Sequence, residues 1–180
     1  MKNTFEILLA GFGGQGVLFG GRVLSEMGLI DGKEVSWMPS YGPAMRSGFC
    51  NCSVVISDSA IGSPVVNYPN YAIIMNTPSF EKFIEAVKPG GKAFVDSSLN
   101  ISEKKAPDNI TVYNIPATKL ASDNDLVGMA NIIMLGKLIK ETGLASQATI
   151  EKAMKLCTEG KEHLYELNLK ALKIGENYSA

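Results

Sequence analysis

The sequence predicts an α/β domain, a three-layer sandwich in which a mostly parallel, Rossmann-like sheet carries helices on both faces. Two observations support this prediction. Apolar runs bounded by glycine, proline and asparagine alternate with amphipathic stretches along the chain. The 180 residues are 46% hydrophobic, which suffices for a sizeable core. Because no linker, internal repeat or low-complexity tract divides the chain, residues 1–180 are expected to form one domain.

The first half of the chain alternates between the two element types. Gly20 and Gly21 lie inside an expected helix and indicate that another element packs closely there. Thr77 and Pro78 suit the cap and first turn of a second helix. The expected elements are strands over 5–10, 34–38, 50–56 and 71–75, a short edge element at 65–66, and helices over 17–27 and from 77 to 87.

The second half continues the pattern. Ser146 can cap a helix that runs to about Thr158. A last helix is expected to stop at Gly175. Its apolar stripe comprises Leu164, Leu167, Ala171 and Ile174. The remaining expected elements are strands over 93–96 and 110–115 and helices over 127–139 and 162–174.

Bulk properties exclude several classes of function. A net charge of −1 leaves no basic surface for nucleic acid or an anionic membrane. No apolar run approaches the roughly twenty residues of a membrane helix, and the N-terminus lacks a signal-peptide pattern. Three cysteines argue against a disulfide framework and suit a reducing compartment. We therefore expect a cytoplasmic protein without nucleic-acid or membrane partners.

Cys50 and Cys52 do not form a metal site by themselves. Zinc and iron–sulfur sites take four ligands, and no further cysteine or histidine pair lies nearby in the sequence. We interpret them as small strand residues that face opposite sides of the sheet.

A glycine cluster directly follows the first apolar run and is the leading candidate for a binding site. Glycines in a strand-to-helix turn permit positive φ and remove every Cβ, so a phosphate, a cofactor or a neighbouring backbone can approach the amides at the helix start. Alternatively, the glycines only let the helix pack tightly on the sheet. The candidate residues are Gly11, Gly13, Gly14, Gln15 and Gly16.

The spacing of Gly11, Gly13 and Gly16 also fits the dinucleotide fingerprint. That fingerprint requires an acidic residue at the end of the second strand, where it holds a ribose hydroxyl. Glu34 lies at the beginning of that strand instead. An NAD site therefore lacks its best supporting residue.

The segment 39–48 is the second candidate. It combines prolines, glycines and hydrogen-bonding side chains, a composition typical of a loop that holds one shape. Arg46 in this loop is one of only two arginines and offers a rigid fork for phosphates or carboxylates, whereas Arg22 is expected to extend from a helix into solvent. The candidate binding residues here are Ser40, Tyr41, Gly42 and Arg46.

The chain is poorly equipped for catalysis, and we assign no catalytic residue. His163 is the only histidine and lies among charged residues on an expected solvated helix face. No nucleophile elbow accompanies it. Asp96 can reach a ligand at the carboxyl edge of the sheet or cap the turn at Ser97 and Ser98.

An ordered set of segments along the chain carries a family resemblance. The segments are 11–16, 40–46, 51–57, 61–66, 88–91, 130–136 and 168–171. Through them nearly the whole chain resembles the gamma subunit of the 2-oxoacid:ferredoxin oxidoreductases, equivalent to the middle domain of the single-chain pyruvate enzymes. The family usually has glutamate where Ala44 stands and glycine where Ser47 stands, and often a glycine–asparagine pair within 124–129.

The resemblance implies a subunit of a multi-chain enzyme that converts a 2-oxoacid and coenzyme A to an acyl-CoA, carbon dioxide and two electrons for ferredoxin or a similar acceptor. Its partners would be alpha and beta subunits, with a ferredoxin-like delta subunit as a further candidate. Thiamine diphosphate and iron–sulfur clusters would belong mainly to those partners, and the isolated chain would be inactive. Family similarity favours 2-oxoglutarate over branched-chain acids and pyruvate.

On this basis the glycine turn and the Tyr41 to Arg46 loop would form one edge of a composite site, near the coenzyme A phosphates or a partner subunit. Two alternatives stay open. One is a stand-alone enzyme that binds NAD or S-adenosylmethionine, since Lys88 to Gly91 before a strand is also typical of methyltransferases. The other is an assembly subunit that touches no ligand.

Overall fold

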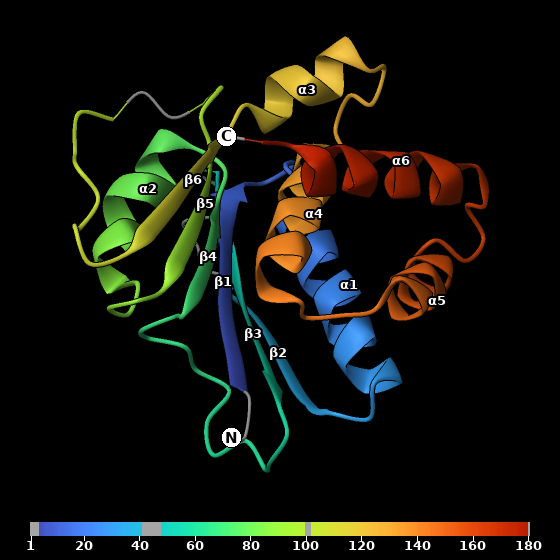
Figure 1. Cartoon of the computed structure of the whole chain (residues 1–180), viewed down its shortest axis with the longest axis horizontal. Coiled ribbons are helices and arrows are strands. Elements are labelled where there is room, and N and C mark those ends of the chain that lie inside the picture. The colour runs from blue at the N-terminus through green and yellow to red at the C-terminus, as the bar shows by residue number, and fades with distance from the viewer. Residues whose placement is uncertain (1–3, 41–47, 100–101, 180) are drawn as a thin grey trace.

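The computed structural model describes residues 4–40, 48–99 and 102–179, so Tyr41, Gly42 and Arg46 of the predicted site lie outside the described residues. The described strands form one mixed sheet of order β2-β3-β1-β4-β5-β6 (Figure 1). Among these strands, β3 alone points opposite to the other five, which confirms the mostly parallel sheet. The strands are β1 Thr4–Phe12, β2 Glu34–Ser40, β3 Phe49–Ser57, β4 Tyr71–Ile74, β5 Lys92–Asp96 and β6 Thr111–Ile115.

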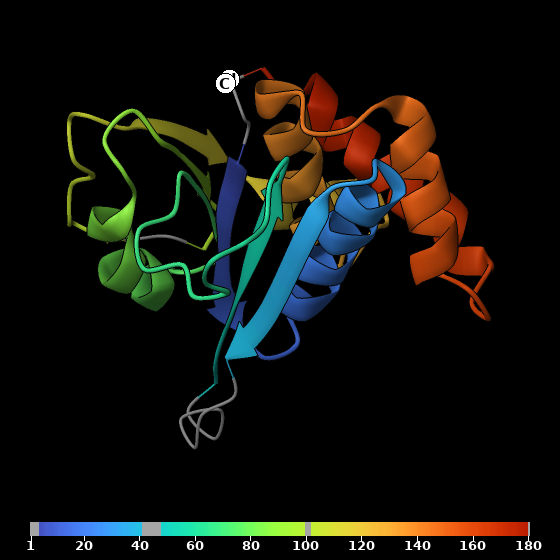
Figure 2. The same ribbon diagram turned by 90° about the horizontal axis from the view of Figure 1, so that it is seen from below.

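Helices cover both faces of the sheet, as predicted. α1 and α4 pack on one face with α5 and α6 outside them, and α2 packs on the other face against β4 and β5 (Figure 1; the sheet is seen from below in Figure 2). The described helices are α1 Val17–Ile30, α2 Thr77–Phe83 with the 3₁₀ turn η2 Ile84–Ala86, α3 Ala117–Asp123, α4 Ala130–Thr142, α5 Gln147–Cys157 and α6 His163–Asn177. No helix in the described ranges is long and apolar enough to cross a membrane.

The core has two parts because the sheet is covered on both sides. The larger cluster lies between the sheet and the helices α1, α4, α5 and α6, and includes Leu9, Ile73 and Leu135. The smaller cluster joins α2 to β4 and β5 through Phe80 and Ile74. Burial on both faces explains why these strands read as continuous apolar runs rather than as alternating ones.

The last helix differs from its prediction. Gly175 does not end α6, which continues to Asn177. A Cβ on Gly175 would lie 1.8 Å from the carbonyl oxygen of Ile133, and one on Gly136 would lie 2.0 Å from that of Leu172. The two glycines therefore let the backbones of α4 and α6 touch. The buried residues of α6 are Asn168, Ala171, Leu172 and Gly175, whereas Leu167 of the predicted stripe is 37% exposed.

Helix starts follow local polar chemistry. Ser146 caps α5 as predicted, since its Oγ accepts from the Thr149 N–H at 3.2 Å. The cap of α2 is Asn76 rather than Thr77, with its Oδ1 2.9 Å from the Ser79 nitrogen. α4 begins three residues later than predicted, and Val127 is 83% exposed.

Other predictions also need correction. Residues 65–66 form no strand, and α3, whose start has no side-chain cap, was not predicted. Cys50 and Cys52 do not face opposite sides of the sheet: both lie in the larger core cluster. The physical reason is that side chains two residues apart on a strand point the same way.

Candidate functional site

The glycine turn joins the carboxyl end of β1 to the first turn of α1. Gly14 and Gly16 have φ angles of 90° and 74°, which confirms that the turn needs a conformation that other residues rarely adopt. A Cβ on Gly13 or Gly14 would meet nothing within 4 Å, whereas Cβ atoms on Gly11 and Gly16 would lie 2.7 Å and 2.5 Å from the side chains of Gln15 and Asn131. Gly11 and Gly16 therefore permit close internal packing, whereas Gly13 and Gly14 face open space.

Some backbone N–H groups of the turn donate hydrogen bonds to other described residues, and others do not. The Gly13 N–H donates to the Gly48 carbonyl at 2.8 Å, and the Gln15 N–H donates to that of Phe12 at 3.1 Å. The N–H groups of Gly14 and Gly16 have no hydrogen-bond partner within the described part of the chain. No acidic residue occupies the first turn of α1, so its partial positive charge is available to an anion.

The Gln15 side chain is turned into the protein. Its Oε1 accepts from the Phe12 N–H at 2.6 Å and from Asn76 Nδ2 at 3.0 Å, and its Nε2 donates to the Met75 carbonyl at 3.1 Å. These bonds join the turn to the carboxyl end of β4.

Asn131 is a site residue that was not among the predicted ones. It lies in the first turn of α4, is 4% exposed, and its Nδ2 donates to the Gly16 carbonyl at 3.0 Å. Its Oδ1 is buried and has no hydrogen-bond partner among the described residues. An unpaired buried acceptor costs free energy, so it is a natural partner for a donor group on a ligand. The available signal was an asparagine in the otherwise apolar first half of this helix.

Two cavities flank the turn. One, of about 370 Å³, is lined by Gly14, Gln15 and residues of α3 and the α3–α4 loop. The other, of about 430 Å³, is lined by Gly16 and Asn131 and includes the cations Arg22 and Lys161 beside Glu159. Gly128 borders both. The turn thus forms a ridge with a hollow on each side at the carboxyl edge of the sheet, where α/β proteins bind ligands.

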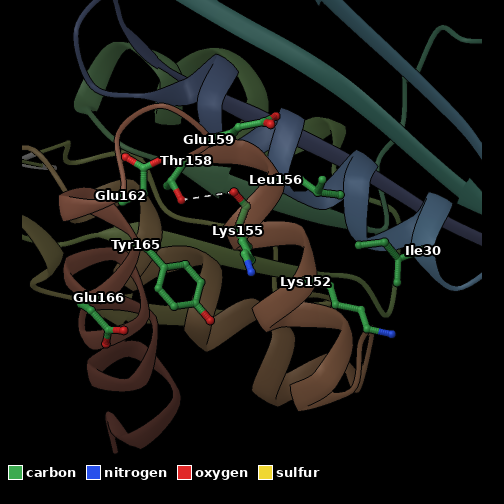
Figure 3. Close-up of a pocket in the computed structure, with 9 residues that line it drawn as sticks. All are labelled: Ile30, Lys152, Lys155, Leu156, Thr158, Glu159, Glu162, Tyr165 and Glu166. Atoms are coloured by element: carbon green, nitrogen blue, oxygen red, sulfur yellow. Dashed lines mark hydrogen bonds between the residues drawn. The ribbon is translucent and has the colours of Figure 1, made fainter.

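A further cavity adjoins this site without containing the glycine turn. It has a volume of about 860 Å³ and extends between α5 and α6 from Thr158 and Glu159 towards Ile30 (Figure 3). Lys152 and Lys155 border it on α5, and Glu162, Tyr165 and Glu166 border it on the side of α6. Its lining includes the buried Thr158, but its charged lining residues lie at the surface, and we assign it no ligand.

The second candidate segment lies beside the turn at both of its described ends. Ser40, exposed at the end of β2, pairs with Asn51 of β3, which in turn pairs with Ala10 of β1. Gly48 accepts the hydrogen bond from Gly13. Both flanks of 41–47 therefore stand at the same sheet edge as the glycine cluster.

The strand order weakens the dinucleotide interpretation further. In the classic dinucleotide fold the second strand lies beside the first. Here β3 separates β2 from β1 and runs antiparallel to both. The end of β2 is therefore two strands away from the turn, and its last residue, Ser40, carries no charge.

Asp96 serves the fold rather than a ligand. It is fully buried, its Oδ1 accepts from the Ser98 N–H at 3.0 Å, and its Oδ2 accepts from the N–H and the hydroxyl of Thr118 at 3.1 Å and 2.6 Å. The carboxylate thus joins the end of β5 to α3. Of the two interpretations, the structure supports the capping one.

The described thiols and the histidine are not arranged for catalysis. Burial raises the pKa of Cys52 to about 12 and that of Cys157 to about 11, in the latter case against the nearby Arg22 charge. Burial also raises the pKa of Cys50. His163 is exposed at the start of α6. Within residues 4–40, 48–99 and 102–179, no group of three or more histidine, cysteine, aspartate or glutamate residues could hold a metal ion.

Comparison with known proteins identifies the family. The family model described as pyruvate ferredoxin/flavodoxin oxidoreductase matches residues 6–178. The chain belongs to this family. It is 38% identical over 156 residues to the 2-oxoglutarate synthase subunit KorC of Methanocaldococcus jannaschii, covering 86% of this chain and 83% of that protein. It is 34% identical over 176 residues to the ketoisovalerate oxidoreductase subunit VorA of Methanothermobacter marburgensis, but spans only 36% of its length.

Solved structures of pyruvate ferredoxin/flavodoxin oxidoreductase relatives share the fold. The gamma subunit of a keto/oxoacid ferredoxin oxidoreductase from Geobacter sulfurreducens matches with a TM-score of 0.81 and 30% identity over 96% of each chain. A 2-oxoglutarate:ferredoxin oxidoreductase from Magnetococcus marinus matches with a TM-score of 0.87 at 21% identity, over 98% of this chain and 31% of that one, which shows a shared fold. The predicted resemblance to gamma subunits is confirmed.

Proposed function

We propose that this chain is the gamma subunit of a cytoplasmic 2-oxoacid:ferredoxin oxidoreductase, and that its glycine turn binds the phosphates of coenzyme A. The observation that carries the proposal is the turn itself. Among the described residues the Gly14 and Gly16 amides and Asn131 Oδ1 have no hydrogen-bond partner, and they lie with the positive end of α1 between two cavities. Such a surface binds an anionic ligand by backbone donors and brings no catalytic group of its own.

Coenzyme A suits this site better than a simple nucleotide. Its phosphates match the amides and the cations Arg22 and Lys161 at one cavity, and its amide-rich arm can donate to a buried acceptor such as Asn131 Oδ1. The Magnetococcus marinus relative is described with coenzyme A and succinyl-CoA bound. Arg46, which lies outside the described residues, would supply a further phosphate contact.

The redox cofactors belong, in this proposal, to other subunits. The described residues do not fit an iron–sulfur cluster, because Cys50 and Cys52 lie inside the core and Cys157 is on α5. They also contain no acidic cluster suited to the metal that accompanies thiamine diphosphate. This chain would instead position coenzyme A for an acyl group formed by the alpha and beta subunits, with electrons passing to a ferredoxin-like delta subunit or to ferredoxin.

We propose 2-oxoglutarate as the substrate. The supporting comparison is the 38% identity with a 2-oxoglutarate synthase subunit, against 34% with a ketoisovalerate and 28% with a pyruvate enzyme subunit. Because the proposed site meets coenzyme A rather than the 2-oxoacid, the acid is selected by other chains of the complex.

The experiment is to purify the complex from native cells, identify its subunits by mass, and measure coenzyme A-dependent reduction of ferredoxin with a panel of 2-oxoacids. Gly16→Ala and Asn131→Ala should raise the KM for coenzyme A about tenfold or more, as loss of a positioned phosphate or hydrogen-bond contact does. Arg46→Ala should raise it or weaken assembly. Gly62→Ala is the control, since a Cβ there meets nothing within 4 Å.

Unchanged KM values in the first two variants would reject the coenzyme A site. Turnover of a 2-oxoacid, NAD or S-adenosylmethionine substrate by the isolated chain would reject the subunit assignment. An assembled complex whose kinetics respond to none of the substitutions would instead support a purely structural subunit.

A further inference from the structure

We propose that Gln15 is a positioning residue which, together with Asn76, holds the glycine turn in the shape that binds coenzyme A. The inference rests on the proposed function and adds a role that the two cavities alone do not assign. Gln15 was predicted to bind the ligand. In the structure its amide binds the protein on both sides instead.

Gln15 lies where the hydrogen-bond ladder between β1 and β4 ends. β1 and β4 are parallel neighbours, and the last bond of their ladder runs from the Met75 N–H to the Ala10 carbonyl at 2.9 Å. The next donor and acceptor, the Phe12 N–H and the Met75 carbonyl, are both bonded to Gln15. The Gln15 side chain joins them, accepting from the Phe12 N–H at 2.6 Å and donating to the Met75 carbonyl at 3.1 Å. It therefore extends the hydrogen bonding of the sheet by one step, with a side chain in place of a strand.

Gly11 lies directly beside the Gln15 side chain. A Cβ at this position would lie 2.7 Å from Gln15 Oε1 and 3.2 Å from the Met75 Cβ. The side chain of Gln15 thus passes over the place where any other residue would carry its Cβ. Position 11 therefore needs glycine because the Gln15 side chain occupies the space that a Cβ would fill. The glutamine, rather than a ligand, explains the first glycine of the cluster.

Asn76 links Gln15 to the start of α2. Asn76 is 3% exposed; its Nδ2 donates to Gln15 Oε1 at 3.0 Å and its Oδ1 accepts from the Ser79 N–H at 2.9 Å. One amide therefore caps α2 and orients the other. A carboxylate at position 76 would keep the cap but lose the donor to Gln15, so the two roles can be separated by Asn76→Asp.

The consequence for binding is that the turn is fixed before the ligand arrives. A stretch with glycines at 11, 13, 14 and 16 has many accessible conformations, and ordering it at the moment of binding would weaken affinity. The three bonds of Gln15 hold Phe12 and the turn that follows it, which includes Gly14 with no described partner for its N–H. Removing them should reduce coenzyme A affinity without touching the chemical step.

The test measures steady-state kinetics of the assembled complex. Gln15→Ala should raise the KM for coenzyme A roughly tenfold, equivalent to about 1.4 kcal/mol, because an ordered loop is lost. The kcat and the KM for the 2-oxoacid should stay within about twofold. Gln15→Glu keeps the acceptor but loses the donor to the Met75 carbonyl and adds a negative charge beside the proposed phosphate site, so it should raise the KM for coenzyme A at least as much as Gln15→Ala. The matched control is Gln147→Ala, which removes an exposed glutamine bonded to Glu151 on α5.

A double-mutant cycle separates positioning from general damage. Asn76→Asp should raise the KM for coenzyme A by itself but add little to Gln15→Ala, because both changes break the same contact. The proposal is overturned if Gln15→Ala leaves that KM unchanged, or if it impairs kcat and both KM values together. If Gly16→Ala and Asn131→Ala raise the KM but Gln15→Ala does not, the coenzyme A site stands and only the positioning role fails.

Discussion

The contact between α4 and α6 yields a sharp prediction about stability. In Gly136→Ala, the new Cβ would lie 2.0 Å from the Leu172 carbonyl oxygen, where real Cβ atoms stay at least 3.0 Å away. The obstacle is backbone and cannot rotate away. The two helices must therefore separate by about 1 Å, which loosens Leu172 and Ala171, both 2% exposed or less, from the core.

The magnitude follows from two opposing effects. Overpacking a close-packed interior costs about 3 kcal/mol at the upper end of the usual range. Alanine in place of glycine inside a helix returns about 1 kcal/mol. We therefore expect the free energy of unfolding to fall by about 2 kcal/mol, which lowers the Tm by roughly 4–8 °C for a chain of this size.

The assay is urea unfolding of the purified chain followed by circular dichroism, with the m-value checked for constancy. Gly20→Ala is the matched control, because it also lies inside a helix but its Cβ would meet only the Leu9 Cδ2 methyl, at 3.0 Å. The free energy of unfolding of Gly20→Ala should lie within about 1 kcal/mol of that of the unaltered protein. Equal stability of Gly136→Ala and Gly20→Ala would refute the claim that the helix backbones touch.

Two further predictions concern buried polar contacts. Asp96→Ala should destabilise the chain by about 3 kcal/mol, because three donors lose their acceptor, whereas Thr118→Ser, which keeps both donors to that carboxylate, should cost under about 1 kcal/mol; thermal unfolding measures both. Burial and the Glu141 carboxylate raise the pKa of Tyr113 to about 12 from an ordinary value of 10, so the folded state retains a proton that the unfolded state loses. Stability should therefore fall as pH rises from about 10 to 12. In Tyr113→Phe that fall should be shallower, and an equally steep fall in urea midpoints would contradict the assignment.

The local features of the glycine turn were predictable because they depend on neighbouring residues. An apolar run followed by Gly11 to Gly16 predicts a strand, a turn with positive φ and a helix, and the structure has all three. The cap at Ser146 and the apolar pattern of α4 could likewise be recognised in the sequence. The ends of these elements were harder to predict. A glycine at position 175 is typical of the end of a helix, yet Gly175 lies within α6, where it packs against the backbone of α4 at Ile133.

The partners of the candidate site were not predictable, because they come from distant parts of the chain. Gln15 reaches Met75 and Asn76 at separations of 60 and 61 residues, and Asn131 reaches Gly16 at 115. Nothing in the residues around Gln15 distinguishes a side chain that binds a phosphate from one that supports the turn. Only the paired register of β1 and β4 decides it.

By itself, the amino-acid order determined which segments form strands and helices, where the chain turns on glycine, and that few groups suited to catalysis are present. Backbone propensity and hydrophobic periodicity act over a few residues, so they can be read directly. The tertiary structure alone decided that β3 enters between β1 and β2, that α4 and α6 meet at Gly136 and Gly175, and that Asn131 lies under the turn. These outcomes depend on how complete elements pack against one another, and the free energy of that packing has no local signature in the sequence.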